Sequence, residues 1–145
     1  MSRQAIFQAS VRYFLDPILP YLDDDSVTEI MVNGPHEVYI ERKGKLEKTP
    51  ARFADEDTLL SAINNVAQWV GREIDEQHPA LDARLPDGSR VHAIIPPSSR
   101  IGPCLTIRKF TREALTLEDL VGFGSLSHQA REFLEICVKL RKNIL

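Results

Sequence analysis

The stretch ALDARLPDGSRVHAIIPP, residues 80–97, contains two runs suited to β-strands on either side of a Pro-Asp-Gly turn. We expect strands at 80–85 and 89–95, joined by a three-residue loop at 86–88. The two prolines at 96–97 end the pairing, because proline has no backbone N–H to donate to a neighbouring strand. The stretch therefore predicts an antiparallel hairpin.

A three-residue loop would place Arg84 opposite Arg90, and Asp82 opposite His92. Side chains alternate across a strand, so these four polar residues are expected to share one face of the hairpin. The other face would receive the apolar side chains of Leu81, Ala83, Leu85, Val91 and Ala93. Two arginines directly opposite each other repel unless an anion or a carboxylate lies between them.

Strand and helix patterns alternate on both sides of the hairpin. We expect a helix at 2–15, strands at 27–32, 38–41 and 45–49, a helix at 56–70, a strand at 104–110, and helices at 117–121 and 128–142. The helix at 56–70 has apolar residues at helical spacing, a cap at Asp55 or Asp57, and Gly71 just after its end. This order predicts an α+β domain with a largely antiparallel sheet and flanking helices.

The composition is ordinary for a globular protein, with 43% hydrophobic and 27% charged residues among 145. A net charge of -3 argues against a general affinity for nucleic acid or anionic membrane. Two cysteines and four histidines follow no metal-ligand spacing, so we expect no metal site. The sequence contains no apolar stretch of about 20 residues and no signal-peptide core, which makes the cytoplasm the expected compartment.

Positive charge is concentrated in residues 80–112, which contain six cations and two carboxylates and so have a net charge of +4. The cations are Arg84, Arg90, Arg100, Arg108, Lys109 and Arg112. Arginine suits phosphate oxygens better than lysine does, because its planar fork can donate two parallel hydrogen bonds. The alternative is that these arginines are solvated or are paired with nearby carboxylates such as Asp82.

Catalytic motifs are absent from the sequence. It contains no Gly-x-x-x-x-Gly-Lys-Ser/Thr phosphate-binding loop, no Gly-x-Ser-x-Gly and no His-Glu-x-x-His. The aspartates at 23–25 precede a strand and are interpreted as a solvated cap in preference to a metal cluster. We therefore expect this sequence alone to hydrolyse no ATP.

The run DARLPDGSRVHAIIPPSSRIGPCLTIRKF, at 82–110, resembles the N-terminal domain of the Tad-pilus secretion ATPases. These belong to the wider superfamily of type II and type IV secretion and pilus ATPases. Three further stretches are similar to this family: EIMVNG at 29–34, VGREIDE at 70–76 and LTLEDLVGFG at 115–124. The closing ICVKLRKNIL, at 136–145, resembles the helix and strand that lead into the family's phosphate-binding loop, so we expect a longer protein.

The resemblance implies a PAS-like sheet followed by a helical linker and a RecA-like domain that binds Mg²⁺ and ATP. It divides the chain into a lead-in at 1–25, a nucleotide-clamping domain at 26–112, and a linker with a first strand at 113–145. The expected assembly is a homohexameric motor ATPase in the cytoplasm, attached peripherally to an inner-membrane secretion or pilus platform. Its subunits would bind ATP between their two domains, and no nucleic acid is expected.

The resemblance also implies roles for individual cations. Arg90 and Arg108 would reach the ATP phosphates and support catalysis, with Arg84, Lys109 and Arg112 as further nucleotide-binding candidates. Two alternatives remain at this stage. One is a free-standing interaction or sensory domain with a PAS-like sheet. The other, single-stranded nucleic-acid binding, is weaker because the aromatic residues do not interleave with the basic ones.

Overall fold

The computed structural model describes residues 3–85, 87–110 and 115–144, and the side chains from residue 9 onward. The chain forms two compact units, at 1–110 and 111–145, and each is described by itself. The expected turn at 86–88 is described only in part, because Pro86 lies outside the described residues.

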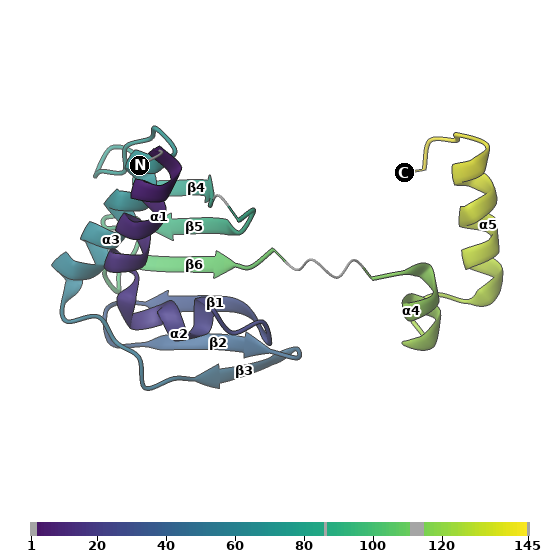
Figure 1. Cartoon of the computed structure of the whole chain (residues 1–145), viewed down its shortest axis with the longest axis horizontal. Helices are drawn as coiled ribbons and strands as arrows, with labels where there is room; N and C mark the ends of the chain where they lie inside the picture. The colour runs from purple at the N-terminus through teal and green to yellow at the C-terminus, as the bar shows by residue number, and fades with distance from the viewer. Residues whose placement is uncertain (1–2, 86, 111–114, 145) are drawn as a thin grey trace. The chain divides into compact units, whose positions relative to one another are not determined.

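Unit 1 consists of one β-sheet and the helices that cover it (Figure 1). Its elements are α1 (Arg3–Phe14), a 3-10 turn (Asp16–Ile18), α2 (Leu19–Leu22), β1 (Val27–Asn33), β2 (Val38–Arg42), β3 (Lys45–Lys48), α3 (Glu56–Trp69), β4 (Ala80–Arg84), β5 (Arg90–Ile94) and β6 (Cys104–Arg108). The six strands lie in the order β3-β2-β1-β6-β5-β4, and every neighbouring pair is antiparallel. The predicted α+β class and antiparallel sheet are confirmed.

The last strand, β6, lies between β1 and β5 and joins two groups of sequential strands into one sheet. On one side are the three strands that precede α3, and on the other is the β4–β5 hairpin. The hairpin has the predicted register, with Arg84 opposite Arg90 and Asp82 opposite His92. This arrangement places β1, which is early in the sequence, directly beside β6, the last strand of unit 1.

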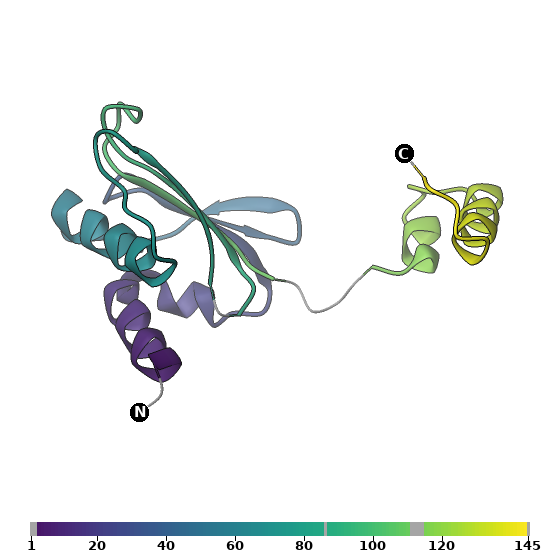
Figure 2. The same ribbon diagram turned by 90° about the horizontal axis from the view of Figure 1, so that it is seen from above.

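The helices α1 and α3 cover one face of the sheet (Figure 2). The buried apolar side chains of the strands pack on that face, in one core cluster with those of the helices. Alternate residues of the central strands are buried there, including Ile30 on β1 and Leu105 and Ile107 on β6. They pack with Leu59, Ile63 and Val66 of α3, Val11 of α1, Leu15 just after α1, and Phe53. We call this the covered face of the sheet, and the opposite side its open face.

The helix α3 begins at a defined cap. The Asp55 carboxylate accepts hydrogen bonds from the backbone N–H of Thr58, at 2.8 Å, and from its hydroxyl, at 2.6 Å. Asp55, and not Asp57, is therefore the cap residue of the two that the sequence offered. Gly71 follows the helix with a φ of +69°, a backbone conformation that glycine adopts without steric cost.

Unit 2 contains α4 (Leu117–Gly122) and α5 (His128–Lys139). Thr116 and Asp119 form a reciprocal capping box at the start of α4, and Ser127 caps α5. One of our expectations is wrong here: the helix α5 ends at Lys139 and not at 142, since Arg141 adopts a left-handed φ of +53°. Residues 143–144 form no strand among the described residues, and their role as the start of a strand that leads into a RecA-like domain stays a prediction.

Candidate functional site

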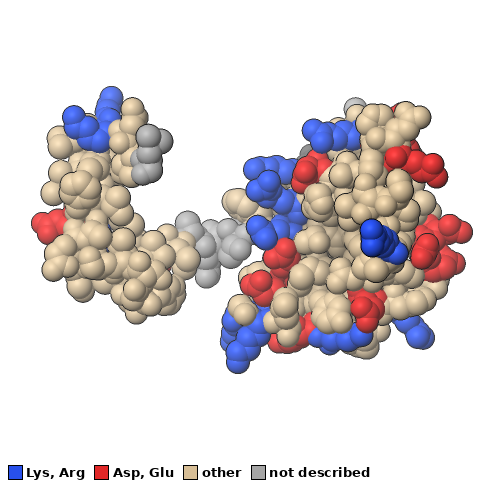
Figure 3. All heavy atoms as spheres, turned by 180° about the vertical axis from the view of Figure 1, so that it is seen from behind, with Lys and Arg blue, Asp and Glu red and all other residues tan. Residues whose placement is uncertain are grey.

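A row of charged side chains crosses the open face of the sheet. The strand register pairs Arg84 on β4 with Arg90 on β5, Arg90 with Arg108 on β6, and Arg108 with Glu29 on β1. Paired residues of neighbouring strands lie on the same face, so these four side chains form one line, which we call the arginine row. Figure 3 views this face and shows basic side chains gathered directly above acidic ones.

The arginine row borders a shallow hollow of about 200 Å³. The hollow is lined by Glu29, Asp82, Arg90, Val91, His92, Thr106 and Arg108. Both arginines to which the resemblance assigned a catalytic role are therefore at one site. Arg84 lies at the outer end of the row and is exposed. The direct pairing of Arg90 with Arg108 was not predicted, because the order of the strands in the sheet was not readable from the sequence.

Both carboxylates of the hollow already have a side-chain partner on a neighbouring strand. The Nη2 atom of Arg108 lies 3.4 Å from both carboxylate oxygens of Glu29, and Nδ1 of His92 lies 3.1 Å from Oδ1 of Asp82. The alternative in which Asp82 neutralises an arginine is not what the structure shows. Among the described residues, Arg84 and Arg90 have no ion-pair partner, so the row retains unneutralised positive charge.

Glu29 is a site residue that sequence reasoning missed. Its side chain is only 18% exposed, whereas that of Arg108 is 66% exposed. The signal was present in the strand pattern, because Glu29 alternates with the buried Ile30 and so faces the open side. Without the position of β6 beside β1, nothing linked Glu29 to Arg108.

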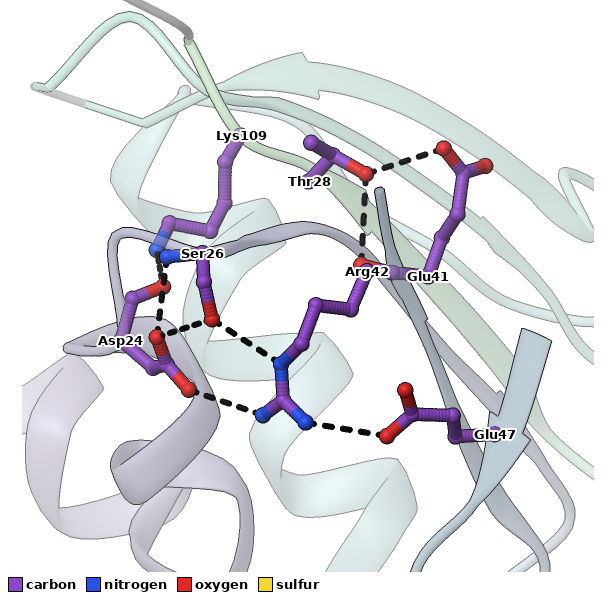
Figure 4. A network of polar contacts seen from close by, with 7 residues as sticks. All are labelled: Asp24, Ser26, Thr28, Glu41, Arg42, Glu47 and Lys109. Carbon is purple, nitrogen blue, oxygen red and sulfur yellow. Dashed lines mark hydrogen bonds and ion pairs between the residues drawn. The ribbon is translucent and has the colours of Figure 1, made fainter. Parts of the chain in front are cut away.

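Lys109 lies in a different polar cluster (Figure 4). Its ammonium donates a 2.6 Å hydrogen bond to the backbone carbonyl of Asp24, and its backbone N–H donates to the carbonyl of Thr28. The Ser26 hydroxyl and backbone N–H and then Arg42 donate to the Asp24 carboxylate, which lowers the pKa of Asp24 to about 2. Lys109 is thus half-buried and engaged away from the arginine row, and Arg112 lies outside the described residues.

A larger hollow, of about 970 Å³, lies on the helical side of unit 1. Its lining comes from α1, the 3-10 turn, the turn between β1 and β2, the loop before α3 and α3 itself. The lining residues are Tyr13, Phe14, Asp16, Pro17, His36, Arg52, Phe53, Ala54, Thr58 and Ser61. It is larger but contains none of the predicted site residues, and its single arginine shares it with Asp16. The arginine row, where cations converge from three strands, is the stronger candidate for an anion site.

Among the described residues, no group of three His, Cys, Asp or Glu side chains is arranged to hold a metal ion. None of the described helices is long and apolar enough to cross a membrane.

Comparison with known proteins identifies relatives over most of the chain. The family described as "Type II/IV secretion system protein" matches residues 14–145. The chain is 39% identical over 123 residues to the type IV secretion system protein VirB11 of Brucella suis, covering 83% of this chain and 34% of that protein. It is 27% identical over 128 residues to a putative conjugal transfer protein of Mycobacterium tuberculosis, covering 84% of this chain and 36% of that protein.

A solved structure shows the same fold. It is the crystal structure of the VirB11 ATPase from the Brucella suis type IV secretion system in complex with sulphate. The TM-score is 0.73 at 36% identity, and the match covers 82% of this chain and 37% of that one. The chain therefore spans about a third of the length of these relatives.

Proposed function

Since the chain belongs to the type II/IV secretion system protein family, we propose that it is the N-terminal, nucleotide-clamping part of a secretion ATPase. The observation that supports this most directly is the direct pairing of Arg90 with Arg108 beside a hollow on the open face of the sheet. The rest of the protein would supply a RecA-like domain that holds ATP and Mg²⁺.

The electrostatics of the row favour a ligand with several negative charges. Neighbouring strands lie about 4.8 Å apart, so the guanidiniums of Arg90 and Arg108 can reach oxygens of the same phosphate or of adjacent phosphates. Like charges directly opposite each other destabilise a sheet, and an anion placed between them reverses that effect. A triphosphate can therefore bridge cations that in its absence only repel one another.

Arg108 and Arg90 would have different roles. Arg108 would stabilise the charge that develops on the transferring phosphoryl group, and Arg90 would mainly hold the nucleotide before reaction. Arg84 extends the row and would attract the nucleotide at longer range. Lys109 would have a structural role and would not contact the nucleotide, because its ammonium donates a hydrogen bond to the backbone carbonyl of Asp24. Arg112 remains a candidate for nucleotide contact.

The wider assembly follows from the same proposal. The subunits would form a homohexamer in the cytoplasm, contacting neighbouring copies and an inner-membrane secretion or pilus platform of the Tad type. The relatives named above belong to type IV secretion and conjugal transfer, so the Tad subtype is a prediction from the sequence resemblance alone.

Turnover of ATP by the full-length protein tests this proposal. Replacement of Arg108 by alanine or by lysine is expected to lower turnover by about 10³-fold, because lysine keeps the charge but loses the bidentate fork. Arg90→Ala is expected to act mainly on the Michaelis constant. Arg100→Ala is the matched control, since Arg100 is exposed in the loop before β6.

Wild-type turnover in both Arg90→Ala and Arg108→Ala, with folding and ring assembly intact, would contradict the nucleotide role. An interaction or sensory domain without a nucleotide role would then be the better account of this chain.

A further inference from the structure

The charge along the open face changes sign within one row. After Arg84, Arg90 and Arg108, the next position is Glu29 on β1, and the register then pairs Glu29 with Glu41 on β2. The row is therefore three cations followed by two carboxylates. The boundary lies between Arg108 and Glu29, which both line the hollow proposed to receive phosphates.

Glu29 is held on the Arg108 side of this boundary by both of its neighbours. Its two carboxylate oxygens lie at equal distances of 3.4 Å from Nη2 of Arg108, which attracts them. Glu41 repels Glu29 from the other side, and the Glu41 carboxylate is itself fixed by a 3.0 Å hydrogen bond from the Thr28 hydroxyl (Figure 4). The half-buried Glu29 side chain has less freedom to retreat into solvent than the exposed guanidinium has.

We propose that Glu29 is a built-in counter-ion of Arg108, which competes with phosphate-bearing ligands for this guanidinium and so weakens their binding. The inference rests on the proposed function of the arginine row. A phosphate that binds Arg108 must replace the Glu29 carboxylate as its acceptor, and must then bind close to a negative charge that remains in place. Glu29 therefore sets how readily the row takes up and releases a nucleotide.

The alternative is that the pair only stabilises the fold. Two features argue against it. The N···O distances of 3.4 Å are longer than those of a tight charge-assisted hydrogen bond, and the guanidinium is largely exposed, so the pair contributes little to stability. A long, exposed pair is also one that an incoming anion can break at little cost.

Binding of inorganic pyrophosphate and of ATP to the 145-residue chain tests the inference. The titration would be followed by the NMR signals of the arginine Nε–H groups, which detect weak binding at individual side chains. Glu29→Gln is expected to lower the dissociation constant of either probe about three- to tenfold, since one nearby negative charge is removed. Asp57→Asn is the control for net charge, because Asp57 lies on α3, on the covered side of the sheet.

A double variant separates competition for Arg108 from a general field effect. If Glu29 acts by occupying Arg108, then Glu29→Gln should change affinity less than twofold in an Arg108→Ala background. Glu29→Asp withdraws the carboxylate by one methylene and should tighten binding to a smaller extent. It also provides a test if the glutamine variant does not fold.

The outcomes distinguish this inference from the function on which it rests. If Arg108→Ala weakens binding but neither Glu29 variant tightens it, the counter-ion role is wrong and the nucleotide role stands. If Glu29→Gln tightens binding equally with and without Arg108, competition for Arg108 is overturned. If no variant binds either probe, or if Arg90→Ala and Arg108→Ala leave binding unchanged, the counter-ion inference is overturned, and turnover of the full-length protein decides the nucleotide role by itself.

Discussion

Ile107 and Arg108 are adjacent on β6, yet they belong to opposite faces of the sheet. Ile107 is 1% exposed beneath the helices, whereas the Arg108 side chain is 66% exposed on the open face. The same contrast repeats on β5, where Val91 is buried and Arg90 is exposed. Stability and the proposed ligand recognition therefore depend on alternate residues of the same strands, and single substitutions can separate the two.

The largest effect is expected on the covered face. Ile107→Ala would remove buried methyl and methylene groups and leave a cavity, which lowers the free energy of unfolding by about 2–5 kcal/mol. Arg108→Ala is expected to change it by less than about 1 kcal/mol, because an exposed ion pair contributes little. Urea denaturation of the two variants measures the contrast. Equal losses of stability would contradict the division between the faces.

The helix that covers the sheet offers a second, smaller effect. Asp55→Ala would leave the backbone N–H of Thr58 without its cap and cost about 1 kcal/mol. Asp57→Ala is the matched comparison, since Asp57 lies in the first turn of α3 and is not the cap residue. The midpoint temperature of thermal unfolding should be lower for Asp55→Ala than for Asp57→Ala. The reverse order would show that the cap is misassigned.

The polar cluster around Lys109 is expected to make the free energy of unfolding depend on pH in the acid range. Hydrogen bonds from Ser26 and then Arg42 lower the pKa of Asp24 from 3.8 to about 2. A carboxyl whose pKa is lower in the folded state stabilises the fold fully above its unfolded pKa, and this contribution is lost as the pH falls towards the folded value. The decline is therefore expected between about pH 4 and pH 2.

Asp24→Asn should remove this part of the decline. Unfolding free energies at several values of pH would show a shallower acid slope for the variant than for the wild type. Asp25→Asn is the control, because Asp25 accepts no hydrogen bond that the structure shows among the described residues. A slope unchanged by Asp24→Asn would mean that the cluster contributes nothing to acid stability.

Local rules predicted much of this molecule. The Pro-Asp-Gly turn fixed the hairpin register, and apolar spacing located α3. Local rules could not predict that β6 lies between β1 and β5. The pairing of β6 with β1 joins Arg108 to Glu29, which are 79 positions apart in the sequence. Arg108 was therefore predicted on a polar face but without its neighbours. Glu29, the carboxylate beside it, was missed for the same reason.

The smallest expected effect has the opposite sign to the others. Arg90 lies between Arg84 and Arg108, so the fold contains two adjacent pairs of like charges. Like charges directly opposite each other destabilise a sheet, and Arg90→Thr removes both pairs while keeping a residue that favours strands. We expect Arg90→Thr to raise the free energy of unfolding by a few tenths of a kcal/mol or more.

A control on the same strand is His92→Thr, which removes the partner of Asp82 and should bring no gain. Saturating pyrophosphate should reverse the order of stability, because a ligand that binds only the folded state stabilises the wild type and binds Arg90→Thr more weakly. If Arg90→Thr is more stable than the wild type without pyrophosphate but not with it, the repulsion between the arginines costs stability and is offset by ligand binding. If Arg90→Thr is instead less stable than the wild type under both conditions, Arg90 contributes to the fold and the division between the faces fails at this position.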